Sequence, residues 1–560
     1  MFMPKSLSSI RIIALLCFTA SAIAIWSTWA YHGKPYQGID DANIFFNYAD
    51  NLANGHGPTF GFCHTRVEGY TSTLWMLLSA LAFWLHGNEM LLLIFSGIML
   101  FTTLLLLTRL FRQRLNDPRD LIPWCILLLL ISLSSPSFVT WTTITLMDTG
   151  VWTLIIMNLV FLLCQAAPHP LWLAMIIILC PLARPEAMLV VPSFFCIRWV
   201  LLIRTQKQIL RELLIYGSAF AVSLTCLTLF RLWYFGYPLP NTFYAKVPPS
   251  LFYRLHEGFH YASAFFLSSR LACMTVIAGI TLLFFSRCIT LESLKKRPTK
   301  TLPAQIFAYT LILIMLPVLA GGDHFHMYRF MQPAWPFLCL LLVWLLVDLV
   351  GLLAVRFPTI KDLSSRICLL ITLSVVWTIG PQFSWAHLQD GASPLLLEFH
   401  IARKSLETGA KLNQIFGTIE DKPSVGVIIA GGTARIYQGE VIDLMGLNNI
   451  AIAHNKGNRI GIRNHAAFEI PIFFQLAPDV LPVHPNDSFL RSALKFLFDS
   501  PDFYHGWTYG KLSSRDVPGC SLETFAKNSF IERNREILHF DQTLQRIPDG
   551  RWIPIRANLP

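Results

Sequence analysis

The chain has 560 residues, of which 54% are hydrophobic and only 14% charged, and its mean hydropathy is +0.52. Soluble proteins carry about 25% charged residues, so these values exclude a single soluble domain, a disordered chain and a small disulfide-stabilised module. The 12 cysteines show no CxxC pair and no zinc-ligand spacing. Most of them fall within apolar segments, which indicates small core residues rather than a metal site.

The formal net charge of +11 is confined to the first two thirds of the chain. Residues 1–385 contain 26 Lys and Arg against 15 Asp and Glu, whereas residues 386–560 contain 18 of each. This distribution argues against nucleic acid as a partner. The excess belongs to the apolar part, where basic loops set the orientation of membrane helices.

Uncharged apolar segments recur from residue 12 to about residue 386, which is typical of an α-helical polytopic membrane protein. The first predicts an uncleaved helix, with a cleaved signal peptide as the alternative. Residues 71–85 are too few for a comfortable span and predict a helix along the outer interface. About eleven spans are expected, at 12–30, 90–108, 121–134, 150–166, 171–183, 187–203, 213–234, 264–286, 303–320, 331–354 and 367–384.

The basic cluster at 109–119 decides the orientation. If both 71–85 and 90–108 crossed the membrane, this cluster would lie outside, whereas a single crossing keeps it in the cytoplasm, as the positive-inside rule favours. We therefore expect a polytopic membrane protein with a cytoplasmic N-terminus. Residues 1–384 would form the transmembrane domain, with the first outer loop at 32–88, and residues 385–560 an extracytoplasmic domain.

The C-terminal segment has a soluble composition and predicts a small α/β domain. Residues 424–430 form a β-branched run typical of a buried strand, and 440–444 a second strand. Gly431 and Gly432 predict a turn between them, followed by a short helix at 433–437. Two cysteines, Cys63 and Cys520, are the clearly extracytoplasmic ones, and a disulfide between them is compatible with that oxidising space.

Two adjacent carboxylates, Asp40 and Asp41, follow the first span by about ten residues. Such a pair at a membrane face serves as a general base or holds a divalent cation near phosphate. The alternative is the start of a helix, because aspartate is a favourable capping residue. A glycine-rich segment behind the pair carries further polar side chains suited to a sugar or a phosphate. These are His56, His64, Arg66, Glu68 and Tyr70.

Three other outer loops carry polar residues. Two of them hold side chains suited to phosphate, with lipid-headgroup anchoring as the alternative for each residue taken singly. These residues are Asn241, Tyr244 and Lys246 in PLPNTFYAK, and His324, His326 and Arg329 in GGDHFHMYR. In the third loop, Arg184 and Glu186 lie between two spans, where a charged pair either bonds across the helix bundle or marks the site.

The first outer loop contains DDANIFFNYADNLANGHGPTF…RVEGYTSTLW and resembles the corresponding loop of a family of bacterial GT-C glycosyltransferases. This is the mycobacterial terminal β-(1→2)-arabinofuranosyltransferase (AftB) family. The loop is also similar to LphB-like proteins of Gram-negative bacteria. The similarity continues at 184–189, 234–246, 321–337 and 441–454 and covers nearly the whole chain. One departure lies in TLMDTGVW, where Asp148 stands in place of a longer glutamate.

The resemblance implies an inverting transferase that moves a sugar, arabinofuranose or another pentose, from a polyprenyl-phosphate donor to a cell-envelope glycan or lipid-linked acceptor. It implies that the base is Asp40 or Asp41, with Asp40 favoured, and that the protein lies in a bacterial inner membrane with residues 385–560 in the periplasm. A divalent cation stays open as a cofactor. The candidate donor-phosphate residues are Lys246, His326, Arg329, His324, Tyr244 and Asn241. The candidate substrate-binding residues are His56, Arg66, Glu68, Tyr70, Asp148, Arg184 and Glu186.

Two other functions remain open, a transporter or flippase of polyprenyl-linked sugars and a non-catalytic glycan-binding membrane protein. A transporter is expected to place charges at the bilayer midplane, within broken helices. Asp348 is the one acidic residue inside a predicted span, and it lies towards the inner end. The polar residues gather instead in the outer loops, which favours the enzyme.

Overall fold

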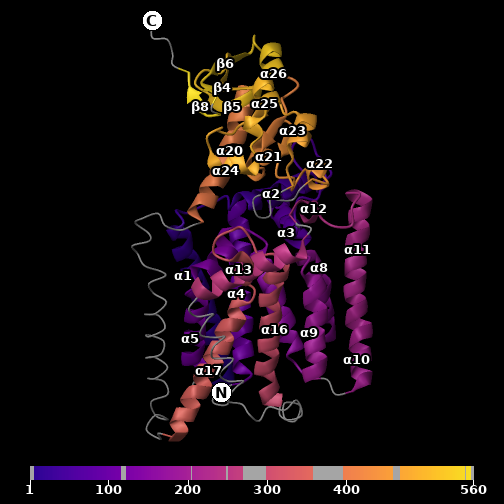
Figure 1. Ribbon diagram of the computed structural model, residues 1–560. Coiled ribbons are helices and arrows are strands. Elements are labelled where there is room, and N and C mark those ends of the chain that lie inside the picture. The colour runs from indigo at the N-terminus through magenta and orange to yellow at the C-terminus, as the bar shows by residue number, and fades with distance from the viewer. Residues whose placement is uncertain are drawn as a thin grey trace. The chain divides into compact units, whose positions relative to one another are not determined.

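The computed structural model describes residues 5–114, 121–202, 205–246, 250–268, 298–356, 395–457, 467–548 and 550–555. The chain divides into two compact units, whose elements are labelled in Figure 1. The first unit consists of residues 1–36, 89–227 and 250–396, and the second of residues 37–88, 228–249 and 397–560. The tail predicted to begin at residue 385 thus belongs to one unit with the first outer loop and a segment from the middle of the chain.

The first unit is built from helices wherever the structure describes it. They are α1 (Lys5–Tyr31), α4 (Glu89–Arg112), α5 (Leu121–Leu133), α6 (Pro136–Val139), η1 (Thr140–Ile144), α7 (Thr149–Leu163), α8 (Pro170–Ala183), α9 (Ala187–Leu201), α10 (Gln206–Glu212), η2 (Leu213–Gly217), α11 (Ser218–Tyr234), α13 (Leu251–Ser268), α16 (Pro298–Ala320), η3 (Arg329–Met331) and α17 (Trp335–Arg356). The last residues of α11 already belong to the second unit.

Several of these helices could span a membrane. Within the described residues, four are long and apolar enough, namely Ile10–Tyr31, Glu89–Arg112, Gln206–Tyr234 and Thr301–Ala320. A fifth results if Leu121–Leu133 and Pro136–Ile144, which meet at a bend of 76°, count as one broken span. By length and composition, these helices are compatible with the predicted helical membrane protein.

The expected count of about eleven spans is not reached by the described helices. Helices α7, α8 and α9 lie where spans were predicted, but each has only 14 or 15 residues. The predicted span 367–384 and most of 264–286 lie outside the described residues. The interfacial segment predicted at 71–85 is a 12-residue helix, α3 (Thr73–Trp84), and it belongs to the second unit.

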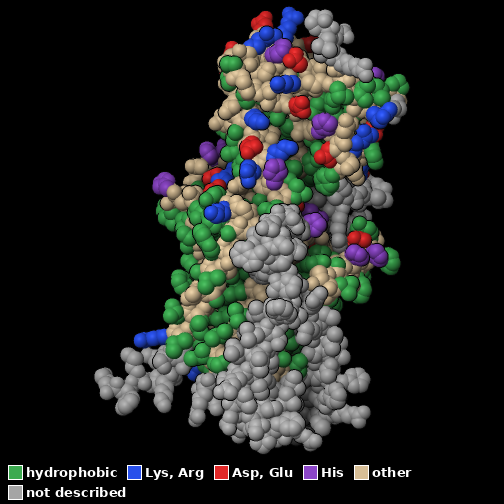
Figure 2. Space-filling model, turned by 90° about the vertical axis from the view of Figure 1, so that its left-hand side faces the viewer, with side chains coloured by type: hydrophobic (Ala, Val, Ile, Leu, Met, Phe, Trp, Pro, Cys, Tyr) green, Lys and Arg blue, Asp and Glu red, His purple; other side chains and the backbone are tan. Residues whose placement is uncertain are grey.

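The surface of the first unit is apolar along its long helices. On α1, Leu15 is 65% exposed and Phe18 61%, and on α8 Leu171 is 76% exposed. On the face shown in Figure 2, charged side chains gather over the C-terminal elements, while the described surface of the helical unit is largely hydrophobic. Contiguous exposed apolar surface marks a membrane or protein contact, so this surface suits lipid.

The second unit contains a six-stranded sheet in the order β2-β1-β3-β5-β4-β6. Strand β1 (Val425–Val427) pairs in parallel with both β2 (Val441–Asp443) and β3 (Val480–Leu481). The antiparallel half consists of β4 (Trp507–Ser514), β5 (Ser521–Lys527) and β6 (Leu538–Gln542), and β7 (Leu544–Arg546) pairs separately with β8 (Trp552–Pro554). The predicted strand–helix–strand is therefore present.

The second unit also contains helices, some between these strands in the sequence and some before the first strand. They are α2 (Asp40–Ala53), α3, α12 (Asn241–Lys246), α20 (Leu396–Ile415), α21 (Gly431–Ile436), α22 (Ile450–Ala453), α23 (Ile470–Leu476), α24 (Ser488–Ala493), η6 (Leu497–Asp499), α25 (Pro501–Gly506) and α26 (Asn528–Arg533). The turn predicted at Gly431 and Gly432 is wrong, because both glycines form the first turn of α21. The reason is the Asp40 carboxylate, distant in the sequence, which accepts hydrogen bonds from both of their N–H groups.

Candidate functional site

Asp40 is the first residue of α2, but its side chain caps another helix. Its carboxylate accepts hydrogen bonds from the backbone N–H groups of Gly431 (2.8 Å) and Gly432 (2.9 Å) at the start of α21. A Cβ atom at Gly431 would lie 2.1 Å from the Asp40 carbonyl oxygen, so only glycine fits there. Of the two interpretations of Asp40, helix cap or catalytic base, this geometry supports a cap, although of α21 rather than of α2.

The environment of Asp40 is buried, and its side chain is 7% exposed. Burial raises the pKa of Asp40 from 3.8 to about 6, against the opposing effect of the N–H bonds from Gly432 and Gly431. Both oxygens are engaged with backbone donors. Asp40 is therefore hydrogen-bonded within the second unit through both carboxylate oxygens.

Asp41 is half-buried on the first turn of α2 and lies near a third carboxylate, Asp443, at the carboxyl end of β2. The Asp443 side chain accepts bonds from the N–H groups of Met445 (2.9 Å) and Asn448 (2.8 Å) and from the Asn448 side-chain amide (2.9 Å). Burial raises the pKa of Asp443, and the negative charge of Asp41 raises it further. Asp41 is thus the most accessible of the three carboxylates.

A buried chain of hydrogen bonds links the first outer loop to the tail. The Gly69 N–H donates to the Tyr48 hydroxyl (3.0 Å), which donates to the Asn448 side-chain oxygen (2.9 Å). A Cβ atom at Gly69 would lie 1.7 Å from that oxygen, so the approach requires glycine. The motif RVEGY therefore packs directly against the motif VIDLMGLNN, although they lie nearly 400 residues apart.

Glu68 was predicted to bind substrate, but it forms a buried ion pair with Arg231 on α11. The Arg231 guanidinium donates to both Glu68 oxygens at 2.8 to 3.1 Å, and the two side chains are 3% and 6% exposed. Arg231 is not among the residues predicted from the sequence. Its position indicates a buried ion pair, since an arginine within an otherwise apolar helix needs a partner.

The segment 234–246 contacts the tail in the same unit. The Asn241 amide donates to the carbonyl oxygens of Gly446 (2.8 Å) and Leu447 (3.0 Å). The His454 ring centroid lies 4.1 Å from that of Tyr237 and 4.2 Å from that of Tyr244. Asn241 and Tyr244, predicted to bind phosphate, therefore make contacts within the unit.

The other first-loop residues are distributed between the surface and the core. The rings of His56 and His64 stack at 4.1 Å, and the Arg66 guanidinium lies 5.1 Å from the Tyr234 ring centre. His56 and Arg66 are exposed. Tyr70 is buried, and its ring packs 4.8 Å from that of Tyr48.

A second polar cluster lies in the first unit. Helix α8 ends at Ala183 because Arg184 precedes Pro185 and adopts an extended conformation (φ −159°, ψ 148°). This places the Arg184 guanidinium against the Asp148 carboxylate (2.9 Å) and the Glu186 carboxylate (2.9 Å). The Asp148 carboxylate thus reaches Arg184 despite its short side chain.

Arg329 belongs to this cluster as well. Its Nε atom lies 2.8 Å from the Asp323 carboxylate, and its guanidinium faces the rings of Phe325 (4.8 Å) and Phe330 (4.9 Å). His324 lies 3.4 Å from the same aspartate, and His326 accepts a bond from Trp141 through its backbone carbonyl. Lys246, predicted to act with these residues, lies at the end of α12 in the second unit.

Metal ligands and disulfides are the remaining candidate sites in the described part of the chain. There, no three His, Cys, Asp or Glu side chains gather closely enough to hold a metal ion. The disulfide between Cys63 and Cys520 is absent, and both thiols are free. The Cys520 sulfur instead lies 3.9 Å from the Lys411 carbonyl oxygen on α20.

Comparisons with known proteins do not identify the chain. No protein-family model matches it, and no curated protein matches it. Its family is therefore a proposal based on its own residues.

Proposed function

We propose that this chain is a GT-C glycosyltransferase of a bacterial inner membrane, which transfers a sugar from a polyprenyl-phosphate donor with inversion. One observation supports the proposal above the others. The second unit brings together the DDAN, RVEGY, PLPNTFYAK and VIDLMGLNN motifs through buried hydrogen bonds. The resemblance to that family rests on these motifs. One of them, DDAN, contains the half-buried carboxylate of Asp41.

The proposed reaction is a single displacement at the anomeric carbon. The acceptor hydroxyl oxygen forms the new glycosidic bond while the bond from the anomeric carbon to the phosphate oxygen breaks. The hydroxyl proton passes to the Asp41 carboxylate, and the polyprenyl phosphate leaves with the bonding electron pair. The sugar is arabinofuranose or another pentose, and the acceptor is a cell-envelope glycan or a lipid-linked sugar.

Lys246 is the strongest candidate for the donor phosphate. In the described part of the chain no carboxylate pairs with Lys246, whereas Arg329 is held by Asp323. An ammonium group at the end of α12, on the outer side in the proposed topology, is suited to a phosphate at the lipid boundary. Arg329, His324 and His326 are secondary candidates, and Asn241 and Tyr244 position the segment that carries Lys246.

The function is tested by incubating the purified chain, in nanodiscs, with radiolabelled polyprenyl-phosphoryl arabinofuranose and cell-envelope glycan fragments. We expect label in the glycan and release of polyprenyl phosphate. If the label stays on the polyprenyl lipid with every pentose donor and acceptor tried, the enzymatic proposal is wrong.

A transporter of polyprenyl-linked sugars is the second candidate, favoured by two observations. The first unit contains a helix pair bent by 76° and a buried cluster of charges around Arg184, both of which occur in transporters. A transporter would move the labelled lipid between the leaflets of a vesicle and leave its glycosidic bond intact.

The proposed topology has about eleven spans, a cytoplasmic N-terminus and a periplasmic second unit, with the short helices α7, α8 and α9 crossing as parts of the bundle. Alkaline phosphatase fused to the C-terminus is expected to be active, because the enzyme folds only in the periplasm. Fusion after Arg114, in the predicted cytoplasmic loop, is the inactive control. The reverse pattern of activities would overturn the orientation.

A further inference from the structure

Helix α13 in the first unit carries the sequence HEGFH, with His256 and His260 four residues apart. Residues at this spacing lie one above the other on the same face of an α-helix, with Cβ atoms about 5–6 Å apart. Two imidazole rings so placed can bind one metal ion, and the pattern is the helical part of the HExxH zinc motif. None of the candidate residues for sugar transfer lies in this segment.

The packing of α13 turns both histidines away from the helix bundle. Gly258, between them, approaches α16 so closely that a Cβ atom there would lie 2.1 Å from the Val318 carbonyl oxygen. On the outer side of the helix, the His256 side chain is 67% exposed, Phe259 is 68% exposed, and His260 is exposed as well. Both rings are therefore open to the surroundings, and a hydrated ion can reach them.

Glu257 holds the His256 ring in an orientation suited to a metal ion. Its Oε1 atom lies 3.2 Å from His256 Nδ1. A metal-binding histidine almost always donates one ring N–H to a carboxylate, a carbonyl group or water, which leaves the other ring nitrogen for the ion. Here the bond to Nδ1 leaves Nε2 as the ligand atom of His256.

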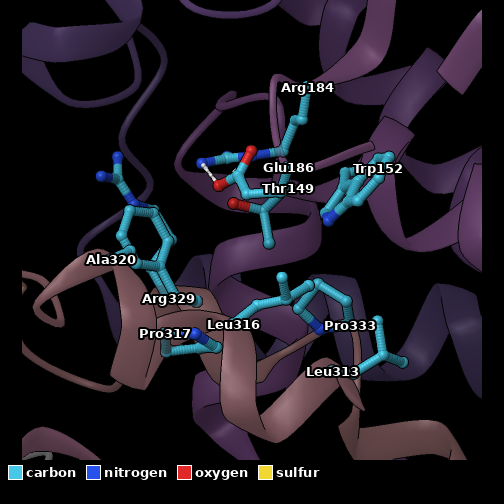
Figure 3. A pocket seen from close by; sticks show the side chains of 11 residues that line it. Thr149, Trp152, Arg184, Glu186, Leu313, Leu316, Pro317, Ala320, Arg329 and Pro333 are labelled. Atoms are coloured by element: carbon cyan, nitrogen blue, oxygen red, sulfur yellow. Dashed lines mark hydrogen bonds and ion pairs between the residues drawn. The ribbon is translucent and has the colours of Figure 1, made fainter. Parts of the chain in front are cut away.

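Cations are a weaker obstacle at this pair than in the polar cluster of the first unit. In that cluster, the Glu186 carboxylate bonds the Arg184 guanidinium, as the dashed line in Figure 3 shows, and a guanidinium repels a metal ion. The one arginine of α13, Arg254, precedes His256 by two residues and so lies on the opposite side of the helix.

We propose that His256 and His260 bind a divalent transition-metal ion, Zn²⁺, on the outer side of the membrane in the proposed topology. Imidazole nitrogen is a favoured ligand of zinc, and water completes the coordination at such a site. The proposal does not depend on the proposed sugar transfer, because the metal is bound on α13 and without donor or acceptor.

The site is assigned to metal binding and not to peptide hydrolysis. A zinc peptidase with the HExxH pattern has a third protein ligand and a glutamate that acts as the base. In the described part of the chain no third His, Cys, Asp or Glu completes a metal-binding group with the pair. Glu257, at the position of the base, bonds His256 instead.

The probe is Zn²⁺ alone, titrated in competition with a chromophoric chelator into the full chain, purified without a histidine tag and held in nanodiscs. We expect a site whose affinity falls at least about tenfold in His256→Asn and in His260→Asn, no less than the loss of an outer-shell partner costs a metal site. The matched control combines His260→Asn with Ser263→His. It keeps two histidines on α13 but places them seven residues apart, about 10 Å along the helix axis, and should bind as weakly as His260→Asn alone.

A second measurement uses the unaltered protein, so it decides the question even if a variant folds poorly. Zn²⁺ should protect His256 and His260 from modification by diethyl pyrocarbonate, as read by peptide mass spectrometry, and Mg²⁺ should not. The stacked rings of His56 and His64 in the second unit are the internal comparison and should stay reactive.

Three results would overturn the proposal. They are zinc affinity that is equal in the unaltered chain and both single variants, affinity fully kept in the Ser263→His control, and protection of histidines outside α13 only. A chain that binds zinc at α13 but transfers no sugar would leave this site established and the proposed function wrong.

Discussion

Replacing Asp41 by asparagine is expected to reduce sugar transfer by roughly a hundredfold or more, since general-base catalysis contributes about 10²–10⁴ in rate. Asparagine matches aspartate in shape but does not accept a proton at neutral pH. Asp41 is the more accessible carboxylate of the acidic pair, whereas both oxygens of Asp40 bind the N–H groups of α21. The loss should therefore lie in turnover rather than in folding.

The measurement is the transfer rate at saturating donor, together with donor affinity, for Asp41→Asn in nanodiscs. Donor affinity is expected to be unchanged, because the base acts on the acceptor hydroxyl. Asp50→Asn is the matched control, since Asp50 lies on the same helix and is 40% exposed. Near-normal turnover of folded Asp41→Asn and Asp40→Asn proteins would show that the acidic pair has only a structural role.

Replacing Asp40 by asparagine is expected to destabilise the second unit by about 1–3 kcal/mol, the cost of one buried N–H group left without an acceptor. Each Asp40 oxygen accepts one N–H group, so in asparagine the side-chain NH2 would replace one acceptor and face the N–H of Gly431 or Gly432 as a second donor. Asp40→Ala removes both acceptors and should cost more. The loss would appear as a lower unfolding temperature and as faster proteolysis of the segments that contain α2 and α21.

The control for this loss is again Asp50→Asn, which weakens the contact of Asp50 with Arg435 on α21 (3.3 Å). That pair is partly exposed and is expected to contribute about 0–1 kcal/mol. Equal destabilisation by the two variants would show that Asp40 contributes no more than a surface pair.

The stability of the protein should also depend on pH through Asp40. Burial raises its native pKa from 3.8 to about 6, so between these values the native state holds the proton that the unfolded chain has lost. The stabilising contribution of protonated Asp40 is therefore complete below pH 3.8 and is lost as the pH rises to about 6. Asp40→Asn should remove this slope. Asparagine does not reproduce the protonated carboxyl group, whose hydroxyl oxygen still accepts an N–H bond.

Much of the secondary structure follows from local sequence. The uncharged runs at 12–30 and 90–108 predict α1 and α4, and the β-branched run at 424–430 predicts β1. These patterns are local because an apolar run is stabilised in a helix or strand wherever its side chains are buried or face lipid. The acidic pair was likewise recognised, since aspartates and a helical pattern lie side by side at the start of α2.

The roles of individual polar residues were decided only by tertiary structure. Asp40 was favoured as the base, but its partners lie 391 and 392 residues downstream. Glu68 was assigned to substrate, but Arg231 neutralises it from 163 residues away. A polar side chain is equally compatible with several partners when the sequence alone is considered. Hydrogen-bond geometry selects one of them only once the distant segments have packed, which is why the cap that Asp40 forms on α21 and the ion pair of Glu68 with Arg231 emerge from the fold rather than from any motif.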